Sequence, residues 1–348
     1  MPRALDAATY HDKKAGKRRG FAMLSIAVIG AGRIGRIHAA NIAANPAAHL
    51  TGVADVDAAA AEALAGSCGA HAVTLDAAFA AEAVLIASPT PTHADYIERA
   101  AAAGRAIFCE KPIDLSADRV RACLQAVQRA GVALMVGFNR RFDPHFLTLK
   151  RRLDGGEIGA LELLTIISRD PAPPPPAYVA TSGGLFRDMM IHDLDMARFL
   201  LGEEPVALHA AASCLVDAAI GAAGDVDTAV VTLRTASGKL CQISNSRRAT
   251  YGYDQRIEAH GAKGLLRAGN VTATTVELAN ADGFVSDPAL PFFLERYAAA
   301  YRAELDAFIA AVAHGAAPLP NGDDGLRALL LADAATESAR TGATIRLA

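Results

Sequence analysis

The stretch "LSIAVIGAGRIG" runs from Leu24 to Gly35 and joins a short apolar run to three glycines. The run is rich in β-branched residues and ends at Gly30, which is typical of a buried strand. Residues 33–44 then place isoleucines at helical spacing. We therefore predict a strand, a tight turn and a helix. Gly30, Gly32 and Gly35 match the G-x-G-x-x-G spacing of dinucleotide-binding turns.

A second apolar segment, "HLTGVAD", ends at Asp55, twenty residues after Gly35. An acidic side chain at this distance accepts hydrogen bonds from the adenosine ribose and repels the 2′-phosphate of NADP. No arginine follows in "DVDAAAAEAL", so the sequence favours NAD over NADP. The alternative is a glycine turn without a ligand, and the complete strand–turn–helix–strand context argues against it.

Apolar strands and helices alternate as far as residue 142. We count six strands and predict an α/β fold with a doubly wound parallel sheet, a Rossmann domain. Ligands of such sheets bind outside the carboxyl ends of the strands, where "SPTPTH" and "EKP" lie at two predicted strand ends. The candidate cofactor-binding residues are Gly30, Gly32, Arg33, Ile34, Gly35, Asp55, Ser88, Thr90, His93, Glu110 and Lys111.

The segment from residue 143 onward has a different pattern. Alternating apolar segments joined by Ser-Gly and Ala-Lys-Gly turns indicate antiparallel strands, and prolines 173–176 indicate a polyproline loop that borders the cleft. We predict an α+β domain with an open, largely antiparallel sheet. The expected organisation is a disordered extension (1–22), an NAD-binding domain (23–142) and a substrate-binding and oligomerisation domain (143–348), whose final helix can pack back on the first domain.

Composition narrows the class of protein. A net charge of −3 leaves no basic field for nucleic acid or an anionic membrane, and no apolar stretch is long enough to span a bilayer. The five cysteines show no C-x-x-C pair, which favours reduced thiols in the cytoplasm. "RRGF" (18–21) is similar to a twin-arginine export motif, but removal of such a signal would also remove the first strand. We expect a cytoplasmic protein with a dispensable tail.

The segment "RDMMIHDLD" (187–195) crowds carboxylates around a histidine on a predicted helix that ends before Gly202. Asp188, His192 and Asp195 stand at i, i+4 and i+7 and share one face, whereas Asp193 falls off it. Asp–x₃–His is a spacing at which a carboxylate can hydrogen-bond an imidazole and raise its basicity. The alternatives are a solvated helix face and a metal site. No second histidine nearby supports zinc, and we predict no metal.

The combination of "VIGAGRIGRIHAANI" with "IASPTPTHADYIERAAAAGRAIFCEKPI" resembles the Gfo/Idh/MocA family of NAD(P)-dependent oxidoreductases. Glu110-Lys111-Pro112 matches the central signature of that family, and the resemblance extends from Leu24 to the end of the chain. It implies that Lys111 lies between nicotinamide and substrate and that the Lys–Pro bond can be cis. A surface lysine at a strand end is the plain alternative.

Within that family, "SRDPAPPP" and "SGGLFRDMMIHDLDMARFL" resemble the inositol 2-dehydrogenase branch. The resemblance implies that His192 removes the hydroxyl proton, that Asp188 orients His192, and that Lys111 hydrogen-bonds the reacting oxygen. The implied reaction is oxidation of myo-inositol by NAD to 2-keto-myo-inositol. A homo-oligomer, tetramer or dimer, is implied as well. A dehydrogenase of another inositol or an aldose, and a catalytically silent NAD-binding sensor, are the alternatives.

The resemblance also extends to the residues that bind the substrate hydroxyls. Together with Lys111, Asp188 and His192, the candidates are Arg140, Asp170, Asp195 and Tyr253. Arg140 could equally form an interdomain ion pair, and Tyr253 could be a strand aromatic. Asp170 departs from the family pattern, in which asparagine is commoner, and this departure bears on hydroxyl selectivity.

Overall fold

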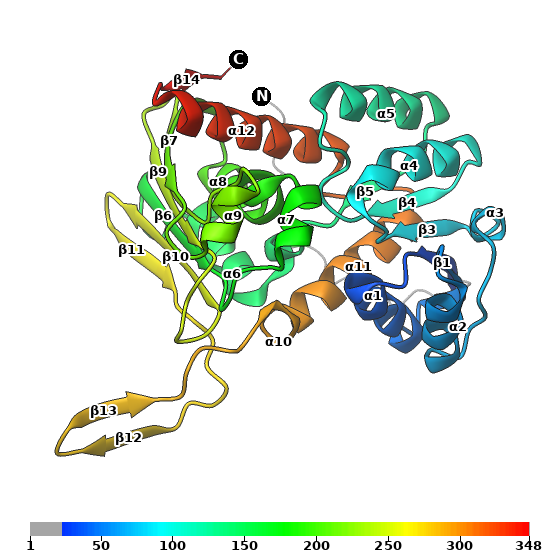
Figure 1. The fold of residues 1–348 in the computed structure, drawn as a ribbon, viewed down its shortest axis with the longest axis horizontal. Coiled ribbons are helices and arrows are strands. Elements are labelled where there is room, and N and C mark those ends of the chain that lie inside the picture. The colour runs from blue at the N-terminus through cyan, green and yellow to red at the C-terminus, as the bar shows by residue number, and fades with distance from the viewer. Residues whose placement is uncertain (1–22, 348) are drawn as a thin grey trace.

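The computed structural model describes residues 23–347, which form two sheets with helices around and between them (Figure 1). The N-terminal sheet is parallel throughout and has the strand order β2-β1-β3-β4-β5. Its strands are β1 (Leu24–Ile29), β2 (Ala48–Ala54), β3 (Ala83–Ile86), β4 (Ala106–Cys109) and β5 (Leu134–Val136). This is the predicted α/β arrangement of a Rossmann domain.

Helices cover both faces of this sheet, as expected for a doubly wound fold. One face packs on α1 (Arg33–Ala44), α2 (Ala58–Ser67) and α11 (Ala298–His314). The other face packs on α4 (His93–Ala102), α5 (Ala117–Ala130) and α12 (Gly322–Thr341). Two of these six helices, α11 and α12, come from the C-terminal part of the chain, so the first sheet is completed by residues far from it in sequence.

The predicted number of six strands is wrong, because this sheet has five. After β5 the chain turns into a short 3₁₀ segment, η3 (Asn139–Phe142), followed by α6 (Pro144–Asp154). The outer edge of β5 is covered instead by the chain that leads into α12. The N–H of Val136 donates to Pro320 O at 2.9 Å, and Met135 forms an isolated bridge with Asn321.

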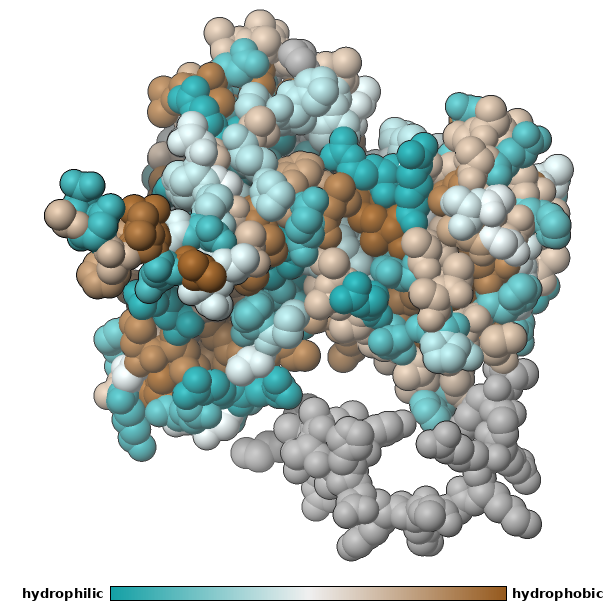
Figure 2. All heavy atoms as spheres, turned by 90° about the horizontal axis from the view of Figure 1, so that it is seen from below, coloured by the Kyte–Doolittle hydropathy of each residue, from teal (hydrophilic) through white to brown (hydrophobic). Residues whose placement is uncertain are grey.

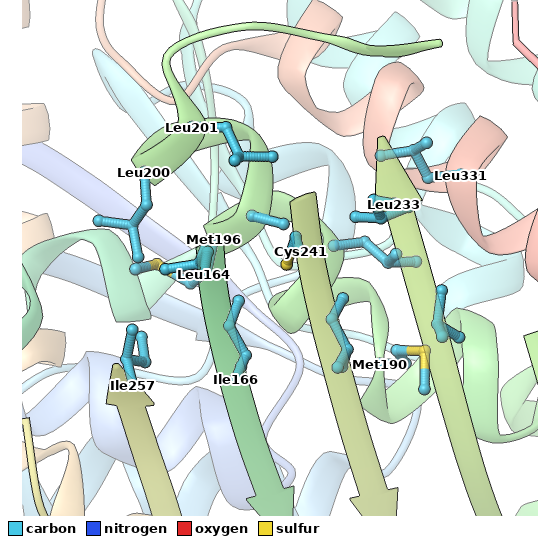
Figure 3. Close-up of a cluster of buried hydrophobic side chains, with 14 of the residues drawn as sticks. Leu164, Ile166, Met190, Met196, Leu200, Leu201, Leu233, Cys241, Ile257 and Leu331 are labelled. Carbon is cyan, nitrogen blue, oxygen red and sulfur yellow. The ribbon is translucent and has the colours of Figure 1, made fainter. Parts of the chain in front are cut away.

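The C-terminal sheet has seven strands in the order β11-β10-β6-β9-β8-β7-β14. They are β6 (Leu161–Arg169), β7 (Pro205–Ser213), β8 (Thr228–Thr235), β9 (Leu240–Ser246), β10 (Asp254–Gly261), β11 (Gly264–Ala268) and β14 (Ile345–Arg346). Only β6 and β9 pair in parallel, so the predicted open and largely antiparallel sheet is confirmed. Its inner face packs on α6, α12 and α8 (Ile191–Leu201), as Met196 and Leu200 against Leu164 illustrate (Figure 3).

The outer face of this sheet carries apolar side chains. Leu163, Leu240 and Leu265 are 41%, 49% and 45% exposed. The strand register places Leu240 beside Leu163, and His260 lies between Leu163 and Leu265. These residues therefore form one row across four neighbouring strands.

A hairpin of β12 (Glu277–Asn280) and β13 (Gly283–Ser286) projects from the body of the molecule (Figure 1). Brown apolar patches lie among teal ones where the hairpin faces the viewer in Figure 2, and Phe284 is 81% exposed. The remaining short elements are α3 (Leu75–Ala78), η2 (Thr90–Thr92), α7 (Pro176–Ser182), the π-helical turn η4 (Leu185–Met189), α9 (Ala218–Ala222) and α10 (Phe293–Arg296). Among residues 23–347, no helix is both long and apolar enough to cross a membrane.

Candidate active site

The glycine turn between β1 and α1 has the shape that a dinucleotide requires. Gly30 has φ +110°, and a Cβ there would lie 2.6 Å from the backbone of Ala87 and Ser88. A Cβ on Gly35 would lie 1.8 Å from Gly30 O, so α1 packs directly on the turn. A Cβ added at Gly32 would have no protein atom within 4 Å. Gly32 also has no side chain that could cap the N-terminus of α1. The helix N-terminus is thus open to a pyrophosphate, and the residues present fit NAD.

Asp55 follows β2 and lies beside the same turn. Its Oδ2 accepts the N–H of Ala31 at 2.6 Å, and its Oδ1 accepts the N–H of Asp57 at 2.9 Å. These two bonds fix the carboxylate at the edge of the glycine turn, where the predicted ribose contact places it.

The "SPTPTH" segment links the ends of two neighbouring strands. Ser88 Oγ lies 2.6 Å from Thr92 Oγ1. The buried His93 ring has one nitrogen 2.7 Å from Ser88 O and the other 2.8 Å from Pro112 O. Burial lowers the pKa of His93. Both ring nitrogens thus lie against backbone carbonyls, of which a neutral ring can donate to one, and His93, a predicted cofactor residue, contacts the segment after Lys111.

Glu110 also points away from the position of Lys111. Its Oε1 lies 2.7 Å from Nε2 of the buried His38, on the α1 side of the sheet. Glu304 lies next to this pair, and its two carboxylate oxygens have no partner among the residues that the structure describes. Burial, followed by the nearby Glu110 carboxylate, raises the pKa of Glu304 well above its ordinary value. The structure therefore gives the predicted cofactor residue Glu110 an interior partner.

Lys111 follows β4 and reaches across to the second domain. The Lys111–Pro112 peptide bond is cis. Lys111 Nζ donates to the backbone oxygen of Asp188 at 2.7 Å and lies 3.3 Å from Asp188 Oδ1. The strand end of the first domain and the acidic segment of the second are thereby brought together.

Asp188 does not belong to the regular helix that the spacing predicts. Residues 185–189 form a π-turn in which the N–H of Met190 donates to Leu185 O at 2.9 Å, and α8 begins only at Ile191. The extra residue in the turn changes the direction of Asp188 relative to α8. Asp188 Oδ1 accepts the hydroxyl of Tyr178 at 2.9 Å. The expected bond from Asp188 to His192 is absent among residues 23–347.

His192 is the first polar side chain of α8, and its ring meets Phe138 edge-on with centroids 6.1 Å apart. Its Nδ1 is buried without a hydrogen-bond partner in the described part of the chain. Burial lowers the pKa of His192 well below its ordinary value, and the cations Lys111 and Arg140 lower it further. His192 is consequently a neutral imidazole that can accept a proton.

Arg140 and Asp193 form a buried ion pair at the centre of the second domain. Asn245 donates to Asp193 Oδ2 at 2.8 Å, and Arg140 Nη2 donates to Ser168 Oγ at 3.3 Å. Burial raises the pKa of Asp193, while Arg140 opposes that effect. Asp193, to which the sequence assigned no function, is therefore the structural partner of a predicted substrate residue.

Asp195 lies apart from Lys111, Asp188 and His192 and has other partners. Asp195 is 1% exposed, and its two oxygens accept from Arg141 Nη2 and Nε at 2.6 and 2.8 Å. Arg141 also donates to Asp324 at 2.9 Å, so this network ties η3 and α8 to α12. In this structure both oxygens of Asp195 pair with Arg141, and the expected contact of Asp195 with substrate hydroxyls stays a prediction.

Asp170 and Tyr253 both lie within electrostatic reach of Arg140 and of each other. Burial raises the pKa of Asp170 to about 6, and Arg247 is the strongest influence in the opposite direction. Tyr253 is buried and stacks edge-on against Phe292 and Tyr297 at 5.8 and 6.0 Å between ring centroids. Tyr253 therefore packs against aromatic rings and also lies close to Asp170.

Sequence reasoning missed three polar residues next to Asp188. Tyr178 bonds to Asp188, Arg247 Nη2 lies 3.7 Å from Asp188 Oδ2, and Asp225 accepts the N–H of Leu185 at 3.0 Å. A signal existed for Arg247, because it lies in a segment of alternating apolar residues, directly after what the structure shows to be β9. Tyr178 follows the proline run, and the predicted loop in fact ends at Pro175, since Pro176 is the first residue of α7. No pattern in the sequence distinguishes Tyr178 or Asp225 from surface residues.

Comparisons with known proteins cover most of the chain. Residues 24–138 match the model of an oxidoreductase family with an NAD-binding Rossmann fold, and residues 146–267 match the GFO/IDH/MocA C-terminal domain. An inositol 2-dehydrogenase of Rhizobium meliloti is 57% identical over 314 residues, which cover 89% of this chain and 95% of that protein.

Two solved structures extend the comparison. A putative myo-inositol dehydrogenase from Sinorhizobium meliloti superimposes with a TM-score of 0.92 at 55% identity, covering 94% of this chain and 100% of that one. A scyllo-inositol dehydrogenase from Lactobacillus casei, solved with bound NAD(H) and scyllo-inositol, gives a TM-score of 0.85 at 30% identity, covering 93% and 99% of the two chains.

Proposed function

Because the chain belongs to the Gfo/Idh/MocA family of NAD-dependent oxidoreductases, we propose that it oxidises a ring hydroxyl of an inositol, with myo-inositol as its preferred substrate and 2-keto-myo-inositol as product. The cofactor is NAD. The observation that carries this proposal is the meeting of Lys111, Asp188 and the neutral His192 at the carboxyl end of β4.

The proposed reaction separates a hydride from a proton. Bound NAD supplies a hydride acceptor for the hydrogen on the carbon that carries the hydroxyl group. The hydroxyl proton passes to His192, whose pKa is lowered by burial and by the neighbouring cations, so the ring is unprotonated when substrate arrives. The carbon–oxygen bond becomes a carbonyl, and the charges balance without any further reactant.

Lys111 stabilises the oxygen that loses its proton. Its ammonium group can turn from Asp188 O toward that oxygen, because a lysine carries three donors on a flexible stem. Asp188 holds this ammonium group in position and keeps a negative charge beside it. In this proposal Asp188 therefore acts on Lys111, not on His192 as the spacing alone suggested.

The charges around the site favour a neutral polyol over an anionic sugar. Arg140 is balanced by Asp193. Lys111 and Arg247 both face Asp188, and Arg247 also faces Asp225, so these two cations are already opposed by carboxylates of the protein. This arrangement disfavours a phosphorylated or carboxylated substrate. Many donors and acceptors at close range suit a ring that offers only hydroxyls.

The proposal places the reaction in the cytoplasm, where NAD is available and thiols stay reduced. All five cysteines are unpaired: Cys68, Cys109, Cys123, Cys214 and Cys241. A second candidate substrate is another inositol isomer, because a solved neighbour at 30% identity binds scyllo-inositol.

The test is NADH production by the purified chain with myo-, scyllo- and chiro-inositol and with aldoses. We expect myo-inositol to give the highest kcat/KM, and NADP to replace NAD poorly. A pentose or hexose with a higher kcat/KM would overturn the substrate assignment.

A variant tests the proton-transfer step separately. His192→Ala should lower kcat by about 10²- to 10⁴-fold, while the Kd for NAD stays unchanged. His49, an exposed histidine on β2 away from the C-terminal sheet, provides the matched control variant His49→Ala, which should behave as wild type. Full activity of His192→Ala would show that the proton goes elsewhere.

A further inference from the structure

Arg247 stands at the carboxyl end of a strand next to the site. It follows β9, and its N–H donates to Asp227 O at 2.9 Å. Strands β6 and β9 pair in parallel with Arg169 beside Ser246, and the N–H of Asp170 donates to Ser246 O at 2.9 Å. Arg247 and Asp170 therefore leave two adjacent strand ends side by side.

The guanidinium group of Arg247 is buried but poorly satisfied. The residue is 2% exposed, and its Nε and Nη2 have no hydrogen-bond partner within residues 23–347. The carboxylates closest to Nη2 are Asp188 at 3.7 Å and Asp225 at 3.9 Å, both too distant for a hydrogen bond. A guanidinium keeps its proton under all ordinary conditions, and buried donors without acceptors are costly. An acceptor from outside the chain would remove this cost.

The position of Asp188 shows which molecule could supply that acceptor. Asp188 Oδ1 contacts Lys111 and Tyr178, whereas Asp188 Oδ2 faces Arg247. Lys111 and Arg247 thus approach the same carboxylate from its two oxygens. Asp225 cannot turn toward Arg247 without losing its bonds to the N–H of Leu185. A molecule bound at Lys111 is therefore within reach of Arg247.

We propose that Arg247 is a substrate-binding and specificity-determining residue, which donates hydrogen bonds to ring hydroxyls of the polyol whose reacting oxygen lies at Lys111. The inference rests on the proposed function and adds a residue to it. Asp170, beside Arg247, accepts hydrogen bonds from a neighbouring hydroxyl. A hydroxyl both donates and accepts, so an arginine and an aspartate together can bind a vicinal pair. A ring that lacks one of these hydroxyls leaves a buried group unpaired and is rejected.

Two variants test the assignment against a matched control. Arg247→Gln should raise KM for the polyol by about 10- to 100-fold, because it removes charge-assisted hydrogen bonds. Arg247→Lys keeps the charge but loses the planar group, and should give an intermediate KM. Arg248→Gln, at the exposed neighbouring residue, should leave KM unchanged. The Kd for NAD of both Arg247 variants should match wild type, and a cooperative thermal unfolding transition shows that they are folded.

A panel of monodeoxyinositols decides whether Arg247 touches the substrate. In wild type, removal of the hydroxyl that pairs with Arg247 should lower kcat/KM strongly. The same deoxy compound should lower kcat/KM of the Arg247→Gln variant only slightly, because the guanidinium group that binds this hydroxyl is already absent. Equal losses in both enzymes for every deoxy compound would overturn the proposal, as would an unchanged KM in the folded variant.

The same data keep the two proposals apart. If wild type oxidises none of the inositols, the proposed function fails. The comparison of Arg247→Gln with Arg248→Gln is then made on the polyol or sugar that wild type does oxidise, together with its deoxy analogues.

Discussion

Asp170 is the carboxylate of the site whose charge changes in the physiological range. Burial raises its pKa to about 6, although Arg247 and Arg140 lower it. Asp170 is therefore largely a neutral acid at pH 5 and a carboxylate at pH 7. The neutral acid can donate a hydrogen bond to a hydroxyl oxygen, whereas the carboxylate accepts a hydrogen bond from the hydroxyl and balances the charge of Arg247. This single group can thus make substrate affinity depend on pH.

We expect KM for the polyol to fall about tenfold between pH 5 and pH 7, as Asp170 becomes a hydrogen-bond acceptor with a charge. In Asp170→Asn this part of the pH dependence should disappear. The free energy of unfolding changes in the opposite direction. The pKa of Asp170 in the folded protein lies above its ordinary value of 3.8, so Asp170 contributes its full stabilisation below pH 3.8. This contribution is lost as the pH rises through about 6. KM profiles and thermal unfolding at pH 4 to 7 check both effects. An identical KM profile in Asp170→Asn would contradict the assignment.

For individual residues, the sequence indicated which residue types form the site but not all of their interaction partners. Lys111, Asp188 and His192 lie near one another, as the motifs indicated. The pairing of Asp195 with Arg141, and of Asp193 with Arg140, could not be predicted. Both arginines come from "NRRF", and which arginine meets which aspartate depends on how η3 crosses α8 in space, a relation that spacing along one helix does not contain.

Two helix beginnings determine the geometry of the site. Helix α1 starts at a glycine turn without a side-chain cap, and its first N–H groups remain available to a phosphate. Helix α8 is preceded by a π-turn, whose start is held by Asp225 through the N–H of Leu185. The wider turn directs Asp188 toward Lys111 while His192 stays on the regular helix.

Gly32→Ala tests the cofactor turn. A Cβ at Gly32 meets no protein atom within 4 Å, so the fold should tolerate it, but it would occupy the space next to the helix N-terminus that the pyrophosphate requires. We expect the Kd for NAD to rise roughly tenfold or more with unchanged thermal unfolding. Gly66→Ala, in the exposed part of α2, is the matched control and should bind NAD normally. Equal NAD affinity in both variants would exclude a close backbone approach at Gly32.

The first half of the fold could be predicted element by element because each strand, turn and helix there follows local rules. The π-turn could not, since its residues match α-helical spacing as well as the neighbouring ones do. The predicted number of strands in the first sheet was wrong for a related reason. The edge of β5 is covered by Pro320 and Asn321, and such a contact between distant segments leaves no mark in the local pattern.

Among the residues that the structure describes, the outer face of the C-terminal sheet carries a row of exposed apolar side chains. Leu265, His260, Leu163 and Leu240 follow one another across β11, β10, β6 and β9. Three leucines between 41% and 49% exposed in one row are unusual for an isolated chain. This row supports the homo-oligomer expected from the sequence, with the open sheet as the contact face.

We therefore expect the wild-type chain to form a dimer or tetramer, and Leu163→Asp to dissociate it, because the variant buries a charge at the contact. Size-exclusion chromatography with light scattering measures the mass. Val56→Asp, at a fully solvent-exposed residue between β2 and α2, should leave the mass unchanged. A monomeric wild-type chain, or an unaltered mass for Leu163→Asp, would refute the assignment of this face.

The positions of α11 and α12 affect how the first domain folds while the chain is being synthesised. Leu305 and Phe308 of α11 close one face of the first sheet, and Ala328 and Leu329 of α12 close the other. During synthesis the first sheet leaves the ribosome before these helices exist. The nascent domain must therefore wait, with apolar surface exposed, for almost the whole chain to be translated. Chains that stop short of α12 should be recognised by chaperones and proteases, so only complete molecules accumulate.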